Sequence, residues 1–278
     1  MIWPLDPFSL PFMQRAAIEL LMLAPLAGVL GAQIVLRRLA FYTHAVGTAS
    51  FPGLVLAGPV GVPPALAALA VGGAFATALE RLGRVRGVGR DVATALGLVA
   101  ALALGVVLAS DVFQSAAGID RLLFGSLLAI GNEELVFTAI AVACALLASA
   151  VCRRTWIASG FDPQVAPGLG LSARAADWVL VVAIAAAVIA AVDAVGALLV
   201  SAILVIPAAT ARLLASSVRA LELGAGLLAI VEGLGGLLLA FELDVPPGAA
   251  IAVLGGIVFA LVAFATALTG HALREGSA

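Results

Sequence analysis

The chain has 278 residues, of which 64% are hydrophobic and only 11% are charged, and its mean hydropathy is +1.22. Soluble domains are nearer half apolar and a quarter charged, so lipid rather than water must solvate most of this fold. The formal net charge is −2 and all 14 basic residues are arginine, which excludes a nucleotide-binding P-loop and lysine Schiff-base chemistry, because both need a lysine.

The N-terminal segment, residues 1–14, contains no basic residue and so lacks the charged region of a cleavable signal peptide. Trp3, Phe8 and Phe12 favour a position at the membrane interface. A spanning helix needs roughly 20 mostly apolar residues. The segments that meet this need are residues 16–36, 41–58, 63–80, 91–110, 133–152, 176–192, 194–213, 219–241 and 248–270.

The apolar run 122–130 is too short to span and is predicted to be a re-entrant or interfacial segment. We found no internal repeat and no soluble domain. The sequence therefore predicts an all-α fold, a polytopic membrane helical bundle with eight or nine spanning helices, in which residues 1–278 form a single transmembrane domain of the cell membrane.

The arginines predict the orientation of the bundle. With the N-terminus outside and nine spans, twelve of the 14 arginines lie on the inner side and only Arg15 and Arg121 lie outside. The C-terminus is then inside, with residues 271–278 as a cytoplasmic tail. The longest inner loop, residues 153–175, has room for a short helix along the membrane and is a candidate docking surface for another protein.

Polar side chains inside a membrane are costly and are therefore functional candidates. They are Glu19, His44, Thr48, Asp91, Asp193, Ser201, Thr210 and Glu232. His44 and Thr48 are four residues apart, which places them on one helix face. Pro52 and Gly53 follow and are expected to interrupt the helix, which is tolerated at membrane depth where the backbone is buried in protein or lines a cavity.

Imidazole is a good ligand for zinc, copper or iron, and a hydroxyl is a weak one. His44 therefore either lines a substrate path or caps the inner end of its span near Arg37 and Arg38; the sequence leaves both open. Asp91, at the start of its segment, suits the positive end of a helix dipole. Glu232 lies midway along its segment and either faces a cavity or is paired.

Other chemistry is poorly supported. Cys144 and Cys152 are interpreted as small apolar side chains, because a disulfide framework or a thiolate zinc site needs more cysteines. No His-Glu-x-x-His or Gly-x-Ser-x-Gly motif occurs, and His271 is the only other histidine. The chain is therefore not expected to be an enzyme.

An ordered set of motifs extends over residues 12–270, and the stretch 195–214, VGALLVSAILVIPAATARLL, is its longest member. The set resembles the metal-type ABC transporter permease family (ABC-3 type), whose members import zinc, manganese or iron. The other matching segments are 35–41 (VLRRLAF), 51–53 (FPG), 91–97 (DVATALG), 123–126 (LFGS), 161–170 and 246–248 (PPG).

The resemblance implies a homodimer with a translocation path along its axis, two ATPase subunits on the inner face and a substrate-binding protein outside. It implies no permanently bound cofactor and no nucleic acid; the metal ion is the transported substrate. The ATPase docking loop is expected at Phe161, Asp162, Ala166 and Gly170. The residues expected along the path are His44, Thr48, Asp91 and Glu232, with His44 as the metal ligand.

One departure from the family pattern affects the substrate. The family usually has Asp-x-x-x-His before Leu-Pro-Gly, whereas this chain has His44 in the Asp position and Thr48 in the His position. Manganese prefers carboxylate oxygen, so the exchange favours a softer metal or a metal chelate. The alternative class is a secondary transporter or channel, which would need internal coupling groups and often has inverted repeats.

Overall fold

The computed structural model describes residues 6–82, 89–112, 127, 130–161, 173–196 and 200–275. Within these ranges every regular element is helical. The elements are η1 (Asp6–Ser9), α1 (Pro11–Leu36), α2 (Ala40–Ala49), α3 (Phe51–Val60), α4 (Pro64–Leu82), α5 (Arg90–Val107), η2 (Leu108–Val112), α7 (Asn132–Phe161), α9 (Ala173–Val195), α10 (Val200–Leu214), α11 (Val218–Leu243) and α12 (Pro247–Glu275).

All nine predicted segments overlap helices in the described part of the chain. Six of them, in α1, α5, α7, α9, α11 and α12, are long and apolar enough to cross a membrane. The helices α4 and α10 are apolar but shorter, and the segment 41–58 is divided between α2 and α3. The all-α membrane bundle is therefore confirmed, while the number of crossings and the sidedness remain predictions. The predicted re-entrant run 122–130 lies outside the described residues except for positions 127 and 130.

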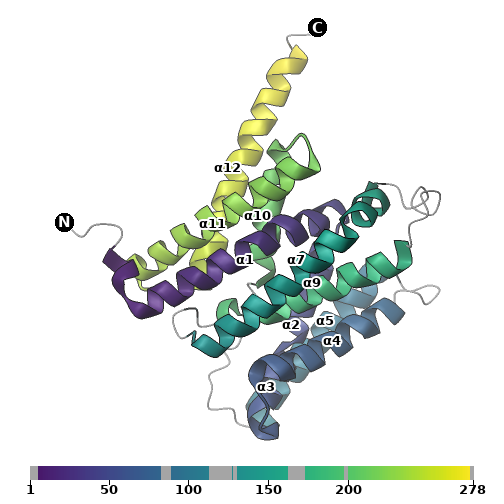
Figure 1. Cartoon of the computed structure of the whole chain (residues 1–278), viewed down its shortest axis with the longest axis vertical. Coiled ribbons are helices and arrows are strands. Elements are labelled where there is room, and N and C mark those ends of the chain that lie inside the picture. Colours follow the sequence, from purple (N-terminus) through teal and green to yellow (C-terminus); the bar gives the residue numbers. More distant parts are fainter. Residues whose placement is uncertain are drawn as a thin grey trace.

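The first helix is the centre of one half of the bundle. α1 makes its most extensive contact with α11 and also packs against α10 and α7, and Figure 1 shows these helices side by side. A Cβ added at Gly28 would lie 2.7 Å from the carbonyl oxygen of Glu222 in α11. Small residues permit such close approach of helix backbones in a membrane, so Gly28 explains how tightly this helix pair packs.

The helices α2 to α5 form the other half of the bundle, and α9 joins the halves through contacts with α7, α4 and α2. In Figure 1, α12 starts against α10 and α11 and then extends away from the other helices. Large apolar side chains are exposed along α5, α7, α11 and α12. Such a surface suits a lipid environment or another subunit.

Candidate functional site

The helix that carries His44 and Thr48 ends at Ala49, one residue after Thr48. Only Ser50 separates α2 from α3, and its hydroxyl donates to the Gly47 carbonyl oxygen at 2.6 Å. Pro52 lies in the first turn of α3 and has no N–H to donate to the Thr48 carbonyl, as a continuous helix would require. The interruption predicted from Pro52 and Gly53 is therefore confirmed, and it is buried inside the bundle.

Thr48 brings a hydroxyl group without a hydrogen-bond partner to this interruption. Its side chain is 1% exposed, and its Oγ1 has no hydrogen-bond partner among the described residues. Its carbonyl oxygen, which cannot accept from Pro52, accepts instead from a backbone N–H at the end of α2. A buried polar atom without a partner calls for a water or a bound ligand, so Thr48 is suited to contact a passing solute.

His44 lies one turn before Thr48 and is tied to α10. Its Nδ1 is 3.0 Å from Oγ of Ser201, and the imidazole is half-buried. If Nδ1 carries the proton and donates to Ser201, the Nε2 lone pair is free to bind a metal. The polar contact of His44 is thus with a distant helix inside the bundle. Ser201 was recognised as a polar membrane residue, but sequence could not identify its partner.

One chain supplies an incomplete metal site. Over the described ranges, no three histidine, cysteine, aspartate or glutamate residues cluster closely enough to hold a metal ion. The interruption offers one imidazole and the hydroxyls of Thr48 and Ser201, with no carboxylate hydrogen-bonded to them in the described part. A metal passing here would need further ligands from water, a chelator or a second chain.

No described hydrogen bond joins Asp91 to His44, Ser201 or Thr48. Asp91 is exposed in the first turn of α5. The N-cap of this helix is Gly89, which has no side chain to cap the helix. This position agrees with a favourable interaction with the helix dipole. α5 packs against α2, the helix that carries His44. Asp91 therefore lies at the start of a helix that contacts the candidate path helix.

Glu232 is buried between α10, α11 and α12, at 2% exposure. It lines a cavity of about 10 Å³ together with Pro207 of α10 and Ile251 of α12, which is room for about one water molecule. Its Oε1 has no hydrogen-bond partner in the described part of the chain. No described hydrogen bond joins Glu232 to the His44 group.

A second buried carboxylate lies on α1. Glu19 is 1% exposed and accepts a hydrogen bond of 2.8 Å from the Thr138 hydroxyl of α7. Its Oε2 is without a partner among the described residues. Glu19 was recognised as a polar membrane residue but was not placed in the path, and the structure locates it at the contact between α1 and α7.

The predicted ATPase docking loop is described only at its edges. Phe161 is the last residue of α7, and α9 begins at Ala173. The remaining predicted docking residues, Asp162, Ala166 and Gly170, lie outside the described residues.

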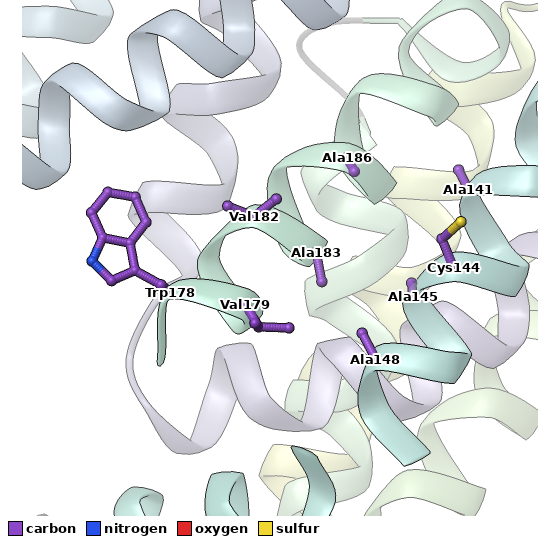
Figure 2. Close-up of a pocket in the computed structure, with 9 residues that line it drawn as sticks. All are labelled: Ala141, Cys144, Ala145, Ala148, Trp178, Val179, Val182, Ala183 and Ala186. Atoms are coloured by element: carbon purple, nitrogen blue, oxygen red, sulfur yellow. The ribbon is translucent and has the colours of Figure 1, made fainter. Parts of the chain in front are cut away.

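An apolar groove of about 340 Å³ is lined by residues of α7 and α9. Figure 2 shows alanines of both helices around it, with the Trp178 indole on the far side from Cys144. A second groove of about 370 Å³ lies between α9 and α4. Apolar walls offer nothing to a hydrated ion, so these grooves suit lipid chains or helix packing. Cys144 and Cys152 are free thiols, as their interpretation as apolar side chains requires.

Known proteins resemble the chain over nearly its full length. The manganese transport system membrane protein MntC of Halalkalibacterium halodurans is 28% identical over 256 residues, covering 92% of this chain and 88% of that protein. The chelated iron transport system membrane protein YfeD of Yersinia pestis is 28% identical over 254 residues, covering 91% and 85%.

A solved structure has the same fold. A chain in the structure of PsaBC from Streptococcus pneumoniae in complex with Fab superposes with a TM-score of 0.84 at 25% identity, covering 93% of this chain and 94% of that chain. The model of the ABC 3 transport family matches residues 9–267. This match covers the helical bundle and the interrupted helix together, and the chain is therefore a multi-pass membrane protein that belongs to the ABC 3 transport family.

Proposed function

We propose that this chain is the membrane-spanning permease subunit of an ATP-driven importer of a transition metal, which a substrate-binding protein delivers from outside. The family match supports the transport function, and relatives named for manganese and for chelated iron support the substrate class. The observation that carries the proposal is the half-buried imidazole of His44 one helical turn from the buried Thr48 hydroxyl, which has no hydrogen-bond partner among the described residues.

ATP hydrolysis belongs to a separate subunit. The chain has no lysine and so no P-loop. The ATPase docks on the inner face at the connection between α7 and α9, where Phe161, Asp162, Ala166 and Gly170 match the family pattern. In this arrangement the N-terminus is outside and the C-terminus inside, because the arginines then lie mostly on the cytoplasmic side.

Two copies of the chain form the working permease. One chain contributes a single imidazole to the interrupted helix, and the described residues hold no closed set of metal ligands. Two chains related by a twofold axis would contribute two His44 imidazoles and two Thr48 hydroxyls to one path. Few strong ligands suit a transporter, since the ion must also leave the site.

The ligand chemistry at the interruption points to the kind of metal. Imidazole suits zinc, iron or copper, whereas manganese prefers carboxylate. His44 and the Thr48 hydroxyl provide no carboxylate, so we expect the path to favour the softer ions. Because the interruption offers few metal ligands, a chelated metal is the second candidate substrate, since a chelator brings its own ligands.

The test is uptake by the complete transporter. We would reconstitute the chain with its ATPase and binding protein in vesicles and measure ATP-dependent uptake of zinc, manganese, iron and copper. We expect uptake of a soft metal, and a shift toward manganese when His44→Asp and Thr48→His are combined. Unchanged selectivity in that variant would reject the assigned path, and ATP hydrolysis without uptake of any free ion would favour a chelate.

A further inference from the structure

The end of the first helix is a tight, hydrogen-bonded turn that leads into the helix carrying His44. The Arg38 N–H donates to the Val35 carbonyl at 3.3 Å and the Leu39 N–H to the Ile34 carbonyl at 2.8 Å. Arg38 has a φ of 58°. This is the Schellman pattern, which fixes the direction in which the chain leaves a helix. The entry angle of α2 is therefore set by the last turn of α1.

Arg37, the residue that caps this helix, bonds two other helices with its guanidinium group. Nη1 donates to Oδ1 of Asp177 in α9 at 2.6 Å. Nη2 donates to the Trp156 carbonyl and to the Ser159 hydroxyl, both in α7 and both at 2.8 Å. The Arg37 side chain is 13% exposed. A planar guanidinium makes several directed bonds at once, which a lysine ammonium cannot reproduce.

The two helices that Arg37 bonds are also joined directly. The Trp156 indole N–H donates to the Ala176 carbonyl at 2.7 Å, and the Trp156 side chain is 1% exposed. The last turns of α7 and the first turn of α9 are therefore held together and held to α1. These are the helix ends that flank the proposed ATPase docking loop.

On its other side, the turn is continuous with the candidate path. The Thr43 hydroxyl donates to the Leu39 carbonyl at 2.9 Å. This bond joins the first turn of α2 to Leu39, the last residue of the α1–α2 turn. His44 is the next residue, and it contacts Ser201. A displacement of the ends of α7 and α9 thus has a short bonded route to the imidazole.

We propose that Arg37 is a positioning residue that couples the docking of the ATPase to the orientation of His44, by joining the flanks of the docking loop to the α1–α2 turn. This inference rests on the proposed function, because it needs an ATPase at the connection between α7 and α9. Coupling of this kind requires an element that both sites bias. The α1–α2 turn is that element, since Arg37 bonds it to α7 and α9 while α2 extends from it toward Ser201.

The experiment compares Arg37→Ala with Arg153→Ala in the reconstituted complex. Arg153 also lies near the end of α7 but forms an ion pair with Glu222 of α11, so it is a matched control that leaves α9 and the turn untouched. Both uptake and ATP hydrolysis are measured. We expect Arg37→Ala to assemble and hydrolyse ATP while metal uptake per ATP falls at least about fivefold, and Arg153→Ala to keep the wild-type ratio.

Asp177→Asn is a second test of the same contact in case the alanine variant misfolds. Asp177 is nearly half exposed and asparagine has the same shape, so this variant should fold. It should lower uptake per ATP, and adding it to Arg37→Ala should bring no further loss, since both act on one contact. Wild-type uptake per ATP in Arg37→Ala, or in Asp177→Asn if the alanine variant does not assemble, would overturn the proposal. Failure of the wild-type chain to take up metal with ATP would instead reject the proposed function.

Discussion

In the proposed path, the hydrogen bond between His44 and Ser201 engages Nδ1 and leaves Nε2 of the imidazole for a metal. Ser201→Ala removes the partner of Nδ1, which is 3.0 Å away, and lets the ring change its tautomer and rotate. Loss of a group that orients a ligating histidine typically costs 10–100-fold in metal affinity. We expect uptake by Ser201→Ala to need about tenfold more metal for half-maximal rate, measured as initial uptake against metal concentration.

Ser201→Thr is the control, because it keeps the hydroxyl and should stay near the wild-type value. His44→Ala should abolish uptake. If Ser201→Ala and wild type have the same concentration dependence, the imidazole is not oriented by Ser201 when it meets the metal.

Each of the two buried glutamates has one oxygen without a partner in the described part, Oε2 in Glu19 and Oε1 in Glu232. Glu19 also accepts a hydrogen bond from the Thr138 hydroxyl, and this difference predicts different effects on stability. A buried polar group without a partner costs about 1–3 kcal/mol. Glu232→Met should therefore raise the thermal midpoint in detergent by a few degrees, while Glu19→Met, which loses a made hydrogen bond, should lower it or leave it unchanged. A lower midpoint for Glu232→Met would mean that a water or an ion satisfies this carboxyl in the membrane.

For individual residues, the sequence predicted which side chains share a local helix face but not which side chains of distant segments are in contact. His44, Thr48 and Pro52 lie within one short segment, so their common face and the helix interruption follow from helix geometry. The partner Ser201 is 157 residues from His44. No periodicity encodes that distance, and the bond exists only because α2 and α10 pack together.

At the scale of elements, Gly53 allows α3 to lie directly against α4. A Cβ added at Gly53 would lie 2.5 Å from the Ala67 carbonyl oxygen, a backbone atom that cannot rotate away. Overpacking of this kind costs about 1–3 kcal/mol. We expect Gly53→Ala to lower the thermal midpoint and to reduce uptake, since it pushes apart the helices beside the interruption.

Gly58 is the matched control in the same helix. A Cβ added there would meet nothing within 4 Å, and alanine is a better helix former than glycine by about 1 kcal/mol. Gly58→Ala should therefore keep or raise the thermal midpoint. A fall of equal size in both variants would show that α3 needs glycine for a reason other than its contact with α4.

Helix positions were predictable where apolar runs are long, and their ends were less so. The run 133–152 lies within α7, which continues to Phe161. The extension contains Arg153 and Arg154, so hydropathy does not register it as part of the apolar run, but Trp156 buries its indole there. Tertiary packing rather than lipid stabilises the last turns of α7, and such packing is not visible in composition.

At the scale of the whole molecule, hydropathy identified the helices but not their neighbours. In lipid, the exposed and buried faces of a helix are similarly apolar, so the alternation that reveals a core in soluble proteins is weak. The close contact of α1 with α11 depends on glycine positions such as Gly28. No feature of the sequence predicted that α9 lies between α7 and α4.

Sidedness is the property of the whole molecule that charge predicts most directly. The α10–α11 turn lies beside Arg212 and Arg219, while the α11–α12 turn follows Glu242 and includes Asp244. Because basic residues favour the cytoplasm, the first turn should be inside and the second outside. Ser216 and Val245 lie in these turns and are both exposed, so cysteines introduced there can report the side.

The two cysteines are introduced separately into a chain in which Cys144 and Cys152 are replaced by alanine. We expect a membrane-impermeant maleimide to label Val245→Cys in intact cells and Ser216→Cys only after permeabilisation, because α11 is long and apolar enough to cross the membrane. With nine spans, the opposite pattern would place the N-terminus inside and reverse every loop, and with it the proposed ATPase face. Labelling of both cysteines in intact cells would mean that α11 does not cross the membrane. That outcome would contradict the proposed topology, because an unbroken apolar helix of this length is suited to span a bilayer.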